Sequence, residues 1–71
     1  MSDDAIRVWR VRKDHKWIDA QVTSARASVE LRYCLDGEPI FARRFPTRAL
    51  AVADAGRRLR ELQRAGWSTH W

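Results

Sequence analysis

The sequence predicts an α+β fold, a four-stranded antiparallel meander packed against one C-terminal helix, in the order ββββα. Three observations predict it. Residues 6–45 contain four segments in which apolar and polar side chains alternate, as they do in half-buried strands. Turn signals such as Asp36–Gly37 separate these segments. Residues 47–65 instead repeat apolar side chains at helical steps. The 71 residues are therefore expected to form one small domain, residues 1–71.

The first two strands are expected at about residues 6–13 and 16–23, joined by a turn at Asp14–His15. Residues 1–5 are polar and are expected to be disordered. In the first strand, apolar side chains occur on both faces, which allows a bulge. In the first strand, Trp9 and Val11 are expected on one face, and Ile6, Val8, Arg10 and Arg12 on the other. In the second strand, Ile18, Ala20 and Val22 are expected on one face, and Trp17, Asp19 and Gln21 on the other.

The third strand, at about residues 28–35, shows the clearest alternation, and Asp36–Gly37 then predicts a tight type I′ turn because both residues tolerate positive φ. The fourth strand is expected at about residues 38–45. It has apolar groups on both faces, so the sequence leaves open which face the helix covers. The two sets are Phe41, Arg43 and Phe45 on one face and Ile40, Ala42 and Arg44 on the other.

The helix is expected over about residues 47–65, after Pro46 ends the last strand. The Thr47 hydroxyl can accept a backbone N–H and cap it. Gly66 suits the left-handed residue that ends a helix, and Trp67 then falls where a Schellman motif packs an apolar side chain back on Leu62. The predicted apolar stripe is Val52, Ala55, Gly56, Leu59 and Leu62.

The sequence favours a binding protein over an enzyme. His15 falls in a turn, and Cys34 falls in the middle of a strand. The sequence shows no histidine spaced with a carboxylate or a nucleophile as acid–base or nucleophilic catalysis would require. No catalytic residues, metal, cofactor or small-molecule substrate are therefore expected. A single cysteine and the absence of an apolar leader indicate a cytoplasmic protein. No apolar run approaches the ~20 residues that span a bilayer, so no membrane association is expected.

The net charge of +5 is unevenly distributed. Basic and acidic residues balance over residues 1–40, whereas residues 41–71 hold seven arginines against Asp54 and Glu61. Such an excess suggests an anionic partner. The alternative is a composition bias of the genome, because twelve of the fourteen basic residues are arginine.

One helix can cover only one face of a four-stranded sheet, so aromatic and basic side chains are expected on the other. The predicted nucleic-acid-binding site consists of arginines for the phosphates and tryptophans that stack on bases. Its residues are Arg10, Arg12, Arg43, Arg44, Trp9 and Trp17. Two alternatives remain open. The tryptophans could form a core pair beside solvated arginines, or the surface could be a dimer interface or that of a protein-interaction or assembly module. The nucleic-acid-binding domain itself is expected to form a homodimer. The choice between DNA and RNA is also open.

The chain resembles a group of short bacterial proteins of unknown function, through Trp9–Arg10, Asp36–Gly37, Phe45–Pro46–Thr47–Arg48–Ala49 and Gly66–Trp67. This resemblance implies a fold and no activity. The strings KWIDAQV and RFPTRALAVADA are also similar to the sheet-plus-helix DNA-binding domains of integrase arm-binding regions and ethylene-response factors. In those domains the sheet enters the major groove. The second resemblance implies that Arg10, Arg12, Trp17, Arg43 and Arg44 face DNA.

Overall fold

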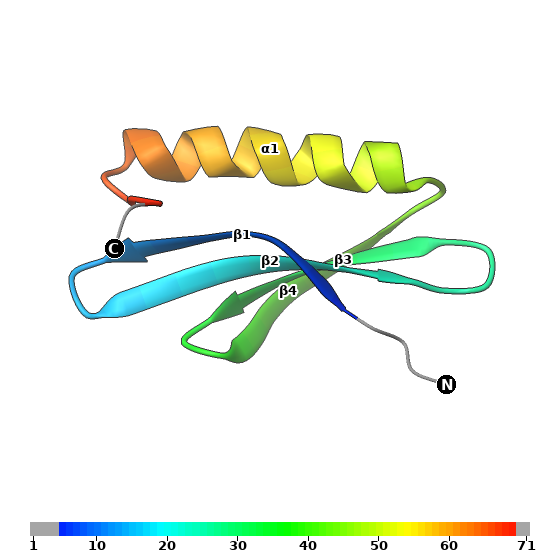
Figure 1. The fold of residues 1–71 in the computed structure, drawn as a ribbon, viewed down its shortest axis with the longest axis horizontal. Helices are drawn as coiled ribbons and strands as arrows, with labels where there is room; N and C mark the ends of the chain where they lie inside the picture. The colour runs from blue at the N-terminus through cyan, green and yellow to red at the C-terminus, as the bar shows by residue number, and fades with distance from the viewer. Residues whose placement is uncertain (1–4, 70–71) are drawn as a thin grey trace.

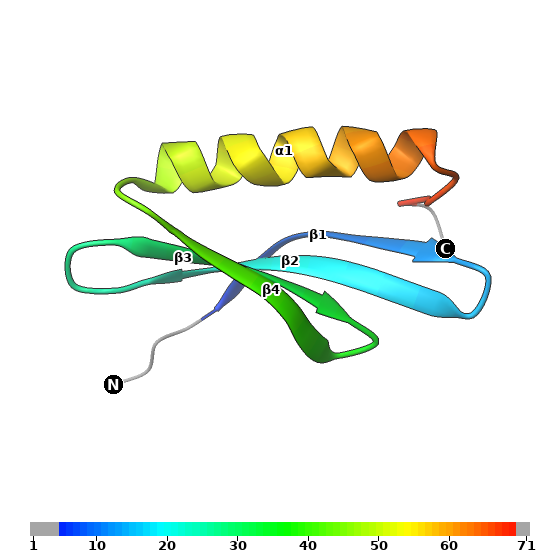
Figure 2. The same ribbon diagram turned by 180° about the vertical axis from the view of Figure 1, so that it is seen from behind.

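The computed structural model describes residues 5–69 (Figure 1). Its elements are the strands β1 (Ile6–Lys13), β2 (Lys16–Ser24), β3 (Val29–Leu35) and β4 (Glu38–Phe45) and the helix α1 (Arg48–Arg64). The strands form one antiparallel sheet in the order β1-β2-β3-β4, and α1 lies across one face of it (Figures 1 and 2). The predicted ββββα fold is confirmed. The expectation of disorder for residues 1–5 falls, apart from Ala5, outside the described residues.

The predicted turn and caps are present. Asp36 and Gly37 have φ of 50° and 87°, as a type I′ turn requires. The Thr47 hydroxyl accepts the N–H of Leu50 at the start of α1. At the other end, Gly66 has φ 101°, and Trp67 N–H donates to the Leu62 carbonyl at 3.0 Å. Together with the bond from Gly66 to Gln63, this is the Schellman motif that the sequence predicts.

The core lies between α1 and one face of the sheet. Val11, Val22 and Leu31, from three neighbouring strands, are almost fully buried on that face. The helix meets them through Ala51 and Ala55, both completely buried. Because alanine is so small, the axis of α1 can approach the sheet closely, and the sheet supplies the larger side chains that fill the space.

Trp9 connects the sheet to the helix. Its indole Nε1 donates a hydrogen bond to the carbonyl of Ala55 at 2.8 Å, and its ring centroid lies 5.8 Å from that of Tyr33. The side chain is 8% exposed and belongs to the core. The prediction that Trp9 lies on the uncovered face was therefore wrong. Trp9 shares the face of Val11, and the pair it forms is with Tyr33 rather than Trp17.

The apolar stripe of α1 differs from the predicted one. Val52 is 42% exposed, whereas Ala51 is buried. Leu59 and Leu62 pack against the core as predicted. The helix is thus rotated so that small residues face the sheet at its N-terminal half and leucines at its C-terminal half. The larger Val52 side chain would hold the helix farther from the bulky Trp9 and Tyr33.

Two bulges set the faces of the edge strands. In β1 the register shifts between Arg7 and Trp9, and Val8 packs against the core. In β4 the shift falls at Ile40, because Tyr33 pairs with Phe41 while Cys34 pairs with Pro39. Phe41, Arg43 and Phe45 are opposite Tyr33, Leu31 and Val29, so this set faces the helix. The extra residue turns Ile40 to the same side, where it lines a cavity.

A polar chain joins β3 to α1 beside Trp9. The Tyr33 hydroxyl donates to Asp54 at 3.1 Å, and Asp54 also accepts from Arg57. Burial, reinforced by the neighbouring Asp54 charge, raises the pKa of Tyr33 to about 12. Burial alone would raise the pKa of Asp54 as well, but hydrogen bonds from Arg57 and Tyr33 outweigh it, and that pKa is lowered.

Trp9→Phe should destabilise the fold by about 1–3 kcal/mol, because it removes the donor to a buried carbonyl. Urea unfolding followed by circular dichroism measures the loss. Trp17→Phe makes the same change on the other face and should cost less. Equal losses in the two variants would contradict the anchoring role of Trp9.

Alkaline pH should weaken the fold through Tyr33. The unfolded chain loses its phenol proton near pH 10, and the folded chain only near pH 12. The contribution of the protonated Tyr33 phenol to the free energy of unfolding is therefore complete below pH ~10 and is lost as the pH rises toward ~12. Tyr33 is the only tyrosine, so phenolate absorbance reports on it alone. Tyr33→Phe should flatten this part of the stability profile, and an unchanged profile would contradict the assignment.

Candidate nucleic-acid interface

The sheet face opposite α1 is the candidate interface, here termed the open face (Figures 1 and 2). The strand register assigns side chains to it, because directly paired residues of antiparallel strands point to the same side. Its charged and aromatic members among the described residues are Arg7, Arg10 and Arg12 on β1, Trp17 and Asp19 on β2, Glu30 and Arg32 on β3, and Arg44 on β4.

The open face is strongly basic. It presents five arginines against two carboxylates, and one carboxylate, Asp19, is only 2% exposed. Asp19 is opposite Arg10 across the strand pair and accepts a hydrogen bond from Gln21 at 2.8 Å. Glu30 is the accessible acid, and Arg32 binds it at 3.0 Å. An approaching anion therefore meets a surface of predominantly positive charge.

Arg10 and Trp17 form a stacked pair at one end of the open face. The guanidinium carbon of Arg10 lies 4.4 Å from the centroid of the Trp17 ring. The backbone of Trp17 is bound to the β3–β4 turn, because its N–H donates to the Asp36 carboxylate at 2.9 Å and its carbonyl accepts from Asp36 at 2.8 Å. The turn holds Trp17 in place, and the Trp17 ring in turn positions the guanidinium that lies over it.

The structure divides the predicted site residues. Arg10, Arg12 and Trp17 lie together at one end of the open face, and Arg44 lies toward the other end, opposite Glu30. Arg43 faces the helix instead, where its charge helps to lower the pKa of Asp54. The prediction that Arg43 and Arg44 lie on one surface was therefore wrong, because their side chains are on opposite faces of the sheet.

Two arginines of the open face were missed by the sequence analysis. Arg32 alternates with the buried side chains of β3, so its outward direction was readable, but its neighbours were not. Arg7 is placed by its pairing with Gln21, on the far side of the bulge at Val8. The register of β1 on β2 was needed to find it.

Cys34 lies on the open face but is only 4% exposed. Burial, together with the nearby charge of Asp19, raises the pKa of its thiol. A thiol with a raised pKa is a poor nucleophile at neutral pH. Within residues 5–69, no three potential ligands among His, Cys, Asp and Glu are grouped closely enough to hold a metal ion.

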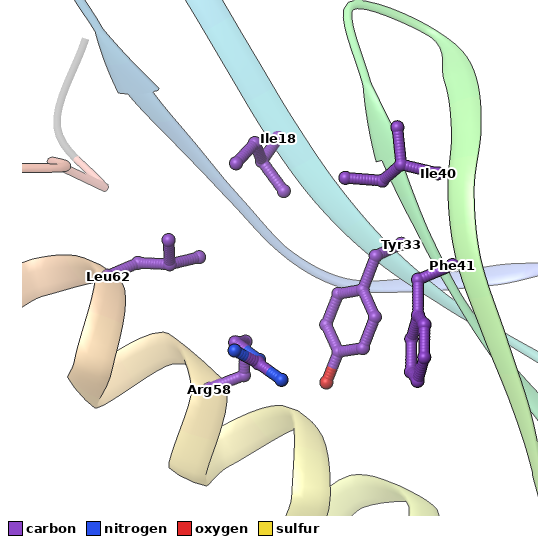
Figure 3. A pocket seen from close by; sticks show the side chains of 6 residues that line it. All are labelled: Ile18, Tyr33, Ile40, Phe41, Arg58 and Leu62. Carbon is purple, nitrogen blue, oxygen red and sulfur yellow. The ribbon is translucent and has the colours of Figure 1, made fainter.

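A cavity of about 240 Å³ opens between the sheet and α1, on the helix side (Figure 3). Ile18, Tyr33, Ile40, Phe41, Arg58 and Leu62 line it. Its polar groups are the Tyr33 phenol, whose pKa is about 12, and the Arg58 guanidinium, which is paired with Glu61 at 3.3 Å. The Tyr33 phenol therefore keeps its proton near neutral pH.

No protein-family model, curated protein or solved structure matches the chain. The helix of residues 48–64 is too short and too polar to cross a membrane, and the described part of the chain contains no other that could.

Cys34 should react slowly with thiol reagents in the folded protein. Burial and the raised pKa both limit the thiolate, so maleimide labelling near pH 7 should be at least ~10-fold slower than in urea. Mass spectrometry over time measures both rates. Equal rates would contradict the burial of this side chain.

Proposed function

We propose that the chain is a non-enzymatic binding domain whose open face binds nucleic acid through the phosphate backbone. The observation that carries the proposal is the gathering of Arg7, Arg10, Arg12, Arg32 and Arg44 on one face, where residues 5–69 place a single accessible carboxylate, that of Glu30. Arginines from three of the four strands contribute, so the positive surface extends across the sheet.

Phosphate contact fits the geometry better than base stacking. In the free protein, Arg10 lies over the ring of Trp17, so a base could stack on that ring face only by displacing the guanidinium. Guanidinium forks bind phosphate oxygens in a bidentate manner. We therefore assign phosphate contacts to Arg10, Arg12 and Arg44, with Trp17 as a positioning residue for Arg10. Trp9 and Arg43 are not part of this proposed site.

The similarity to sheet-plus-helix DNA-binding domains agrees with this arrangement, because those domains also present the sheet face away from the helix. Contacts to phosphates position a protein without reading sequence. The proposal therefore expects weak sequence preference.

The test is a pair of charge-matched double variants. Arg12→Gln with Arg44→Gln removes two charges from the open face, and Arg60→Gln with Arg64→Gln removes two exposed charges from α1. The first variant should bind labelled DNA and RNA oligonucleotides ~10-fold or more weakly and reduce the logarithmic salt slope by about 2. Fluorescence anisotropy at several salt concentrations measures both quantities. The second variant should resemble the unmodified protein.

Equal weakening in both double variants would mean that only net charge matters and would remove the open face as the site. No saturable binding by the unmodified protein at low salt, to single strands or duplex, would overturn the proposal. The surface would then be better explained as a site for an acidic protein partner.

A further inference from the structure

The outer side of β4 is an uncovered sheet edge. Seven of its eight residues are exposed, with Phe45 half-buried. Within residues 5–69, β3 is the single strand that pairs with it. The backbone groups on its other side, among which Pro39 has no N–H, are therefore not paired with any strand of the described residues. Exposed edges of this kind are templates for pairing between chains.

The opposite edge of the sheet is partly closed. Arg12 N–H donates to the Ser68 carbonyl at 2.8 Å, and Ser68 N–H donates to the Arg12 carbonyl at 2.9 Å. Both edge strands carry a bulge, at Val8 in β1 and at Ile40 in β4. Of the two edges, β4 is the one against which residues 5–69 place no further segment.

An apolar patch accompanies the β4 edge. Ile40 and Phe41, adjacent in the strand, are 57% and 50% exposed, so two large apolar side chains meet solvent side by side. Both line the cavity beside α1, and Phe41 lies against Tyr33 with ring centroids 6.0 Å apart (Figure 3). A partner strand would cover both side chains and close that cavity.

The sequence of β4 is complementary to itself when read in the opposite direction. In the antiparallel register that places Glu38 opposite Arg43 of a second copy, Pro39 meets Ala42 and Ile40 meets Phe41. Every pair shares a side of the sheet: Glu38 and Arg43 face the helix with Ile40 and Phe41, while Pro39 and Ala42 face the open side. The bulge at Ile40 is what makes the sides match. Parallel pairing would instead put like charges side by side.

We propose that two copies of this chain pair antiparallel through β4, about a twofold axis between Ile40 and Phe41, into one eight-stranded sheet. The charges favour a second copy as the partner. Each β4 carries one acidic and one basic residue, so two copies can form two identical ion pairs. The Ile40–Phe41 contacts form the centre of the interface, and the two Glu38–Arg43 pairs flank it. The pairing does not depend on nucleic-acid binding.

Sedimentation equilibrium tests this proposal, together with charge-reversal variants. Between ~10 µM and ~1 mM, the average mass should rise from that of one chain toward that of two. Glu38→Arg and Arg43→Glu should each raise the dissociation constant ~10-fold or more, because each places two like-charged pairs in the interface. The double variant Glu38→Arg with Arg43→Glu restores opposite charges and should recover the dimer.

Phe41→Lys should also dissociate the dimer, and Leu50→Lys is its matched control. Leu50 is 50% exposed like Phe41 but lies on α1, away from β4. Circular dichroism confirms that each variant is folded. A single-chain mass for the unmodified protein at ~1 mM would overturn the proposal. So would a double variant that stays as dissociated as the single ones, or equal dissociation by Leu50→Lys. The oligonucleotide experiment uses none of these residues, so the two proposals can fail separately.

Discussion

The close approach of α1 to the sheet is the constraint on which the rest of the structure depends. Ala51 and Ala55 let the helix lie near enough for the Trp9 indole to reach the Ala55 carbonyl. Once this contact is made, Trp9 and Tyr33 occupy the space under the helix, and the Tyr33 hydroxyl meets Asp54. A domain of this size can bury only about 60% of its unfolded surface. A few large aromatic side chains placed against small helical ones make good use of that limited core.

This arrangement assigns different roles to the two faces of the sheet. The helix side collects the apolar groups, and the open face is left to arginines, which keep their charges in water. The exception is Asp19, an acid buried on the open face beneath its neighbours. Its position opposite Arg10 offsets part of the positive charge at the point where the arginine stacks on Trp17. The open face is therefore basic without being uniformly so.

Sequence patterns were sufficient to predict the strands and the helix, but not all of the contacts that their side chains make. Alternation and turn chemistry located every strand and the helix to within one or two residues, because each signal is local. The position of Trp9 was missed, although its alternation with Arg10 already placed it with Val11. The rotation of α1 followed from the size of Trp9 and Tyr33, which no helical period encodes. Alternation already separated Arg43 from Arg44, but only the pairing of β4 with β3 showed which of the two faces the helix covers. The side of Ile40 could be found only through the bulge there, because one extra residue reverses the faces that precede it.

The contact between Ser68 and Arg12 bears on how far any assembly of this protein can grow. A sheet with two open edges adds copies without limit and becomes a fibre. Here the segment after α1 returns to β1 and occupies part of that edge, and Lys13 fastens it by donating to the Ala65 carbonyl at 2.8 Å. With part of the β1 edge occupied, the pairing proposed for β4 would leave little regular edge for the addition of further copies. An assembly formed in that way would be a closed, finite particle rather than an open-ended ribbon.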